Sequence, residues 1–439
     1  MSSASGAGLP GYFDQALREV NFFGGRLLSG RDMADEQQAT ASRERALALA
    51  LGSGVAAGLT VSQARDASGL RMAAVDVQPG TGIAPDGSLL RLGQPLRIAL
   101  ARSSASAAAT ALGTGDFQLC GVGPSGGPTG VSGVQVLTIA PADTLSSDRA
   151  VGVAVDDPGL PQVCAARWRL RGVQFRLASV PASALMADAL ALLDALAAGN
   201  DGVADALRNR LAWDCLGAAA LAAARADPLG LAGQTGYPLG LVARANLLAA
   251  NELPLALVVW GAKGLAFVDM WALRRALHRA DFGEPLWLSS GRRLAEGEAG
   301  MAGQAQHLAE LQAEPAVDTA SLRAIDIFRY LPAAGLLPLA GTSVKGFDAD
   351  RFFSGLGVSE VQVAEGAALE PLLRHATSHP PMDLLAEPPA LVWRLRLREN
   401  LLESNARPCL LWLAGSVPLD LAPRDNRARF DTARFAPGV

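Results

Sequence analysis

The N-terminal part of the chain combines an apolar segment with a polar helix. The pattern predicts a helix over 32–51, which Ser29 or Asp32 can cap and which Gly52 can end. A long polar stretch leaves this helix only a narrow face for packing. The preceding segment carries four large apolar side chains among glycines: Phe22, Phe23, Leu27 and Leu28.

Apolar and polar residues alternate along much of 55–177, which is the period of β-strands. The sequence Pro85-Asp86-Gly87 between 82–84 and 89–92 is a strong turn signal and predicts a hairpin. The whole stretch therefore predicts an antiparallel β domain. Its other predicted strands are 58–61, 72–77, 116–122 and 133–140.

The segment 167–177 shows a change of parity. Arginines alternate with Trp168 and Leu170 before Gly172, whereas after it Val173, Phe175 and Leu177 form the apolar set. A bulge at Gly172 would restore one consistent face, because one extra residue shifts the side-chain alternation. We therefore expect a bulge there.

After residue 181, apolar residues recur at the spacing of helices instead of alternating with polar ones. Helices are predicted over 182–200 and 203–224, and again over 269–279 and 298–314. A buried strand at 255–260, with a hairpin partner at 264–267, interrupts them. From 325 onward, helical and strand patterns are mixed. Strands are predicted at 391–398 and 408–413, and a polar, extended tail is predicted over 423–439.

These patterns predict an α+β fold. It has an N-terminal helix and antiparallel β domain, a central helical region and a mixed α/β C-terminal domain. The expected divisions are 1–54 (arm and helix), 55–180 (antiparallel β), 181–320 (mainly helical) and 321–439 (mixed α/β).

Composition narrows the class of protein. Of 439 residues, 50% are hydrophobic and 18% are charged, which excludes global disorder. The net charge of −4 lacks the basic excess of a general nucleic-acid binder, so we expect no nucleic-acid partner. Few charges on a long apolar chain favour surface that is buried against partners.

The sequence also predicts the cellular compartment of the protein. The first ten residues lack the basic and apolar regions of a secretory signal, and the apolar runs reach about ten residues, short of a membrane span. We therefore expect a cytoplasmic protein with no membrane insertion. The scattered cysteines give no zinc-ribbon spacing and predict isolated thiols: Cys120, Cys164, Cys215 and Cys409.

Several segments resemble catalytic or ligand-binding motifs, but the residues around them do not form the structures that those motifs require. The G-x-S-x-G match at 123–127 is followed by residues that cannot start a helix, as a nucleophile elbow requires. The glycines of 52–58 follow a helix and precede a strand, the reverse of a dinucleotide fingerprint. His375 and His379 have metal-ligand spacing, with Glu370 and Asp383 nearby, but Pro380 interrupts any helix.

Two further clusters have structural and functional interpretations. Asp269, beside Trp271, Arg274 and Arg275, fits an ordinary helix N-cap better than an active site. The second cluster lies on the strand 391–398, where it forms either a solvated face or an interface salt-bridge ladder: Arg394, Arg396 and Arg398. We expect no catalytic residue, metal or cofactor.

A family resemblance adds to this. The run 22–32, followed by Glu36-Gln37, resembles a pattern aromatic-aromatic-x-Gly-x-Leu-Leu-Thr-x-x-Asp-Phe-x-x-Glu-Gln found in proteins associated with phage-tail-like contractile injection systems. Gly30 and Met33 depart from that pattern. Further stretches similar to the group are 52–61, 79–87, 171–177, 208–212, 267–271 and 330–332.

The resemblance implies a non-catalytic structural component, baseplate-associated or peripheral, that contacts other particle subunits and copies of itself. It is cytoplasmic during assembly, and release in an extracellular particle stays open. We take Phe22, Phe23, Leu27 and Leu28 as an arm that docks either on a neighbour or on its own domain. The alternatives are a target- or glycan-binding module and, third, a hydrolase of envelope polymers.

Overall fold

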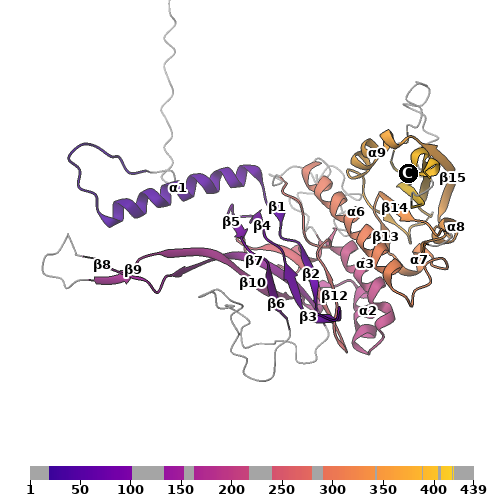
Figure 1. Ribbon diagram of the computed structural model, residues 1–439, viewed down its shortest axis with the longest axis horizontal. Coiled ribbons are helices and arrows are strands. Elements are labelled where there is room, and N and C mark those ends of the chain that lie inside the picture. The colour runs from indigo at the N-terminus through magenta and orange to yellow at the C-terminus, as the bar shows by residue number, and fades with distance from the viewer. Residues whose placement is uncertain are drawn as a thin grey trace, which may run out of the picture.

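A computed structural model describes 19–100, 133–152, 163–216, 240–278, 290–341, 344–387, 389–403, 407–417 and 419. The predicted α+β class is confirmed: an N-terminal helix, small antiparallel sheets, central helices and a mixed C-terminal sheet follow one another. Figure 1 shows that the sheets and helices form a body, from which the N-terminal helix and a long β ribbon extend to one side.

The helix α1 (Gly30–Leu51) confirms the prediction for this segment. Ser29 and Asp32 form a capping box at its N-terminus, and Gly52, with a positive φ of 101°, ends it. The segment before it folds back along the helix, since Glu19 accepts from Arg43 at 2.6 Å. Most of α1 is exposed, and an ion pair of 2.5 Å from Arg45 to Asp86 ties it to the body.

Two small antiparallel sheets follow α1. One has the order β1-β4-β5 and the other β2-β3-β6. The predicted hairpin is confirmed as β4 paired with β5. The strands are β1 (Gly54–Gly58), β2 (Val61–Arg65), β3 (Arg71–Val77), β4 (Gly80–Ile83), β5 (Leu89–Leu92) and β6 (Leu96–Ala99).

The predicted strand over 58–61 is wrong, because the chain passes from one sheet to the other there. Leu59 has a φ of +51° and is fully buried, so its side chain is held in the core while the backbone turns. A Cβ at Gly58 would lie 2.0 Å from the carbonyl oxygen of Pro79, which leaves room only for glycine.

The largest sheet has the order β10-β7-β11-β12 and is antiparallel throughout. Its strands are β7 (Gly133–Leu145), β10 (Arg169–Ser179), β11 (Leu253–Gly261) and β12 (Gly264–Asp269), which confirms the predicted hairpin at 255–267. Strands from the regions 55–180 and 181–320 thus share one sheet. The four-part domain division remains a prediction.

The predicted bulge at Gly172 is wrong. The register of β10 and β7 runs without interruption from Arg169 opposite Leu145 to Ser179 opposite Gln135. The alternation is free to change because the outer half of this ribbon has little cover on either face, and residues 169–171 are all exposed. The ribbon continues into a further pair, β8 (Arg149–Gly152) and β9 (Val163–Ala166).

Helices α2 (Ala187–Ala197), α3 (Ala204–Cys215) and α5 (Gly240–Arg244) pack beside this sheet and share a core with it. Helices α6 (Ser290–Ala313) and α7 (Ala324–Ile327) instead bury apolar residues in the core of the C-terminal region. Two 3-10 turns lie at Ala182–Ala184 and Asp201–Val203. The predicted helices over 182–200, 203–224 and 298–314 are confirmed within the described residues, with shifted ends.

The predicted helix over 269–279 is wrong. Asp269 caps a single turn by accepting from the Ala272 amide at 3.2 Å. The backbone then extends and pairs with the start of β1, where the Val55 amide donates to the Arg275 carbonyl at 2.9 Å. These pairings satisfy the backbone groups that a helix would otherwise have used.

The C-terminal region is built on a mixed sheet in the order β14-β18-β17-β15, in which β15 and β17 are parallel. Its strands are β14 (Ala334–Pro338), β15 (Gly357–Ala364), β17 (Leu391–Leu397) and β18 (Cys409–Ala414). Other elements are α8 (Ala349–Phe352), a 3-10 turn at Gly366–Ala368, α9 (Leu369–Ala376), α10 (Arg398–Leu402), and the pair β13 (Tyr330–Leu331) and β16 (Met382–Asp383).

Candidate functional site

The N-terminal arm, residues 19–29, displays its apolar side chains to solvent. Phe22 is 53% exposed, Phe23 63%, Leu27 91% and Leu28 48%. Arg26 lies 5.9 Å from the centre of the Phe23 ring and bonds Asp32 at the helix start, which fixes the approach to α1. The predicted interface residues of the arm are therefore brought together and lie largely uncovered by the described part of the chain.

The β ribbon carries a second set of exposed groups. Trp168 is 55% exposed, and the Arg167 guanidinium lies 5.1 Å from its ring centre. Leu145 and Leu170 are exposed beside it, and the neighbouring arginines 169 and 171 are exposed as well. Figure 1 shows that α1 and this ribbon extend from the same side of the body. We call the arm, α1 and the ribbon residues 142–152 and 163–172 the projection.

Of the three arginines predicted as a row on one strand, Arg394 and Arg396 lie on β17 but Arg398 does not. Arg394 has a side chain only 11% exposed, pairs with Asp350 at 2.5 Å and donates from Nε to the Ser359 carbonyl at 2.9 Å. β17 ends at Leu397, so Arg398 starts α10 instead, where it pairs with Glu365 at 3.0 Å. A role for Arg394, Arg396 and Arg398 in an interface remains a prediction.

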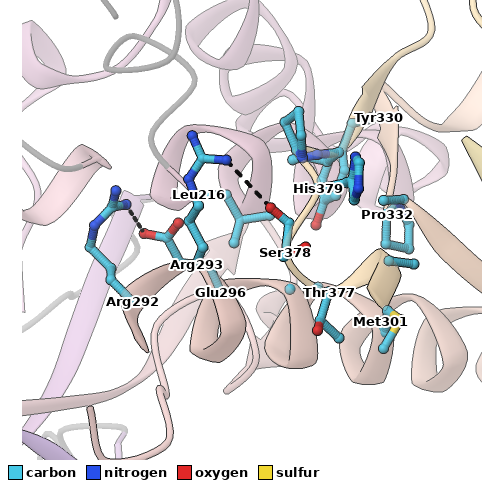
Figure 2. A pocket seen from close by; sticks show the side chains of 16 residues that line it. Leu216, Arg292, Arg293, Glu296, Met301, Tyr330, Pro332, Thr377, Ser378 and His379 are labelled. Atoms are coloured by element: carbon cyan, nitrogen blue, oxygen red, sulfur yellow. Dashed lines mark hydrogen bonds and ion pairs between the residues drawn. The ribbon is translucent and has the colours of Figure 1, made fainter. Parts of the chain in front are cut away.

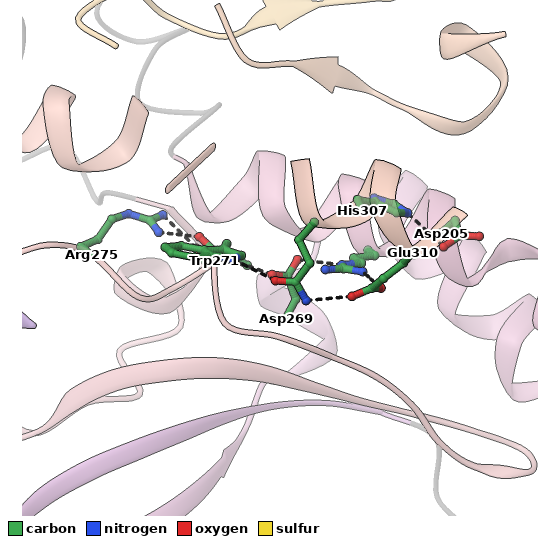
Figure 3. A network of polar contacts seen from close by, with 9 residues as sticks. Asp205, Asp269, Trp271, Arg275, His307 and Glu310 are labelled. Atoms are coloured by element: carbon green, nitrogen blue, oxygen red, sulfur yellow. Dashed lines mark hydrogen bonds and ion pairs between the residues drawn. The ribbon is translucent and has the colours of Figure 1, made fainter. Parts of the chain in front are cut away.

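A buried polar network lies between α3, α6 and the end of β12 (Figure 3). Arg208, 5% exposed, donates from Nε to Asp269 at 3.3 Å and from Nη1 to Glu310 at 2.5 Å. Beside it, His307 Nε2 lies 3.0 Å from an Asp205 carboxylate oxygen. Burial would raise the pKa of Glu310, but Arg208 and a hydrogen bond from Gln306 hold it below its usual value.

This network corrects the interpretation of the Asp269 cluster. Asp269 caps a turn rather than a helix, and its main partner is Arg208, 61 residues away. Arg274 bonds the Gly58 carbonyl and Arg275 bonds its own turn, so neither joins Asp269. No local spacing in the sequence links Asp269 to Arg208 or Glu310, because these residues lie far apart along the chain.

A small cavity lies between α6 and the segment 376–381, at its contact with the end of α3 (Figure 2). It has about 50 Å³ of open space. Its polar lining includes Arg292, Arg293 and Glu296 on α6 and Ser378 and His379 opposite. Burial, with His375 and Arg293 nearby, lowers the pKa of His379. Tyr330 also lines the cavity, and burial raises the pKa of its hydroxyl.

The histidine pair does not gather a ligand set. The His375 and His379 rings lie 5.0 Å apart, but α9 ends at Ala376. Glu370 is bound to Arg374 and Asp383 to Arg329. Within the described residues, no group of three or more His, Cys, Asp or Glu side chains could hold a metal ion.

Other sequence features have simpler outcomes. The glycines of 52–58 end α1 and enter β1, as expected. The G-x-S-x-G match at 123–127, the strand predicted at 116–122, Cys120 and the tail 423–439 lie outside the described residues. No helix in the described ranges is long and apolar enough to cross a membrane.

Comparisons with known proteins add little. No protein family and no curated protein matches the chain. Among solved structures, a crystal structure of TssK is similar, with 14% sequence identity, and the likeness covers 39% of this chain and 36% of that one. The matched part thus spans about a third of TssK. With a TM-score of 0.20, this likeness carries no argument about function.

Proposed function

We propose that the chain is a non-catalytic structural subunit of a phage-tail-like contractile injection particle. It acts there through protein–protein contacts at the baseplate or at a peripheral position. The resemblance of residues 22–37 to proteins of such systems supports this assignment. The observation that carries the proposal is the exposure of the same residues, since the arm that bears the pattern has its apolar side chains in solvent.

The energetics favour a partner for the arm. Apolar surface gains about 25 cal/mol for each Å² removed from water, and aromatic anchors are frequent at the centres of protein interfaces. Phe22 and Phe23 retain most of that surface in the isolated chain. A complex in which a neighbouring subunit covers these rings gains this stabilisation, whereas folding of the chain alone does not provide it.

The ribbon supports a second contact from the same side of the molecule. Trp168 and Leu170 supply exposed apolar area, and residues 167, 169 and 171 supply positive charge. Asp143, opposite Arg171, and Asp148, 3.9 Å from Arg167, offset only part of that charge. A partner subunit with an acidic rim around an apolar centre fits this surface.

The polar groups of the Arg208 network and of the cavity beside α6 support a structural role more than a catalytic one. Asp269 and Glu310 both bind Arg208, and Glu296 binds Arg292 at 2.8 Å. Burial opposes the effect, but Arg208 helps to hold the pKa of Glu310 below its usual value, so Glu310 makes a poor general acid or base near neutral pH. The hydrolase alternative gains no support from these described groups.

The direct test is the composition of the particle. Contractile particles are purified from cells that carry the gene for this chain, and their subunits are quantified by mass spectrometry. We expect the chain in fixed stoichiometry with the baseplate proteins, and its absence from intact particles would contradict the proposal. A deletion that leaves assembly normal but abolishes attachment to target cells would favour the target-binding alternative instead.

A further inference from the structure

The cavity between α6 and the segment 376–381 has the size and lining of a site for one small group. Its open space of about 50 Å³ has room for roughly four water-sized groups. Leu216, Met301 and Pro332 supply apolar walls. A Cβ at Gly297 would lie 2.2 Å from the Thr377 carbonyl oxygen, so the two walls are in close backbone contact there.

The described residues that line the cavity carry more positive than negative charge. Among its described lining residues, Arg292 and Arg293 bring two guanidinium groups and Glu296 brings one carboxylate. Glu296 accepts from Arg292 at 2.8 Å. Among the described residues, Arg293 donates one long hydrogen bond of 3.4 Å to the Ser378 carbonyl. Burial and neighbouring Arg292 lower the pKa of its guanidinium, and Glu296 offsets only part of this. An anion beside Arg293 would relieve this cost.

We propose that this cavity binds a single carboxylate on a short apolar stem, supplied by an acidic side chain or a C-terminus of a partner protein. A guanidinium fork matches the planar carboxylate, which it can bind through two hydrogen bonds. The apolar walls fit one or two methylene groups behind it. The same walls and the small volume disfavour a phosphate, which presents polar oxygens in all directions.

The test uses the full chain and sodium propionate, a carboxylate with such a stem. Binding is measured by saturation-transfer NMR and calorimetry at constant ionic strength, with neutral propionamide as the control ligand. We expect propionate to bind in the millimolar range and propionamide to bind at least tenfold more weakly. Equal binding of the two compounds, or no binding of either, would overturn the proposal.

Variants locate the site. Arg293→Gln should weaken propionate binding at least tenfold, whereas Arg374→Gln, an exposed arginine on α9, should leave it unchanged. Gly300→Leu is a second variant that keeps the charges and fills the space, since a Cβ there has its nearest neighbours at 3.8 and 3.9 Å. Propionate binding that survives both Arg293→Gln and Gly300→Leu in folded protein would place the site elsewhere and refute the assignment.

Two peptides separate the sources of the carboxylate. One is capped at both ends with a central glutamate, and the other has a free C-terminus and no acidic side chain. If either peptide competes with propionate, the result supports the site and identifies which kind of carboxylate it binds. If neither competes, the proposed binding of a protein partner is overturned. These results are independent of particle composition, so this proposal and the proposed function can fail separately.

Discussion

The C-terminal sheet and the projection place similar side chains in opposite surroundings. In the sheet region, Phe352 contacts the rings of Phe347 and Phe353 edge-on at 5.4 and 5.0 Å, and each of the three is 1% exposed. In the projection, Phe22, Phe23 and Trp168 are each more than half exposed. Both regions are rich in apolar side chains, but only one uses them to hold the chain together.

This difference assigns different physical roles to the two regions. Buried aromatic residues contribute several kcal/mol each to folding, whereas exposed ones contribute little to the stability of the isolated chain. Large exposed apolar patches mark sites of interaction in soluble proteins. We infer that the body supplies stability and that the projection supplies contacts.

The largest expected effect tests the body. Trp412, 1% exposed, packs against Phe353 and donates from its indole nitrogen to the Pro332 carbonyl at 3.3 Å. Trp412→Ala should lower the free energy of unfolding by about 3–5 kcal/mol, because it leaves a large cavity. Trp168→Ala on the ribbon is the matched control and should change it by less than about 0.5 kcal/mol. Urea unfolding measures both, and similar losses would remove the contrast.

A smaller effect is expected in the buried network. Asp269→Ala leaves the Arg208 guanidinium, which is 5% exposed, without one of its two carboxylates. We expect a loss of about 2–3 kcal/mol in the free energy of unfolding. Asp201→Ala breaks an exposed pair with Lys263 and should have almost no effect. If the two variants unfold at the same urea concentration, the network does not contribute to the stability of the fold.

The smallest of the expected stability effects depends on pH. The pKa of His379 in the folded chain lies below 6.5 because burial, His375 and Arg293 all disfavour its charge. The unfolded chain therefore binds a proton first as the pH falls, and stability should decrease from about pH 6.5 down to the folded pKa. His379→Gln should make unfolding less sensitive to pH between 7.5 and 5.5. An unchanged pH dependence would show that His379 does not contribute.

Local patterns predicted local structure well. The cap at Ser29, the turn at Pro85-Asp86-Gly87 and the strands β17 and β18 all depend on neighbouring residues, and all were predicted. Two of the errors lie where the backbone of a distant segment determines the local conformation. The break at Leu59 depends on Pro79, and the extended chain after Asp269 depends on strand β1.

The candidate site was predicted only in part. Alternation placed Arg398 on a strand with Arg394, but the strand ends one residue earlier, which no side-chain pattern signals. The Arg208 network and the α6 cavity join residues from distant parts of the chain, so periodicity could not reveal them. The arm was identified because its aromatic pair and glycines are contiguous in sequence.

The most direct measurement of the central claim compares assembly and stability in one variant. Phe22→Ala with Phe23→Ala is expected to reduce incorporation into isolated particles at least tenfold, while the free energy of unfolding of the chain changes by less than about 0.5 kcal/mol. Leu89→Ala, which removes an exposed leucine on β5, should alter neither quantity. Normal incorporation of the double variant, or a loss of stability large enough to explain reduced incorporation, would contradict the account.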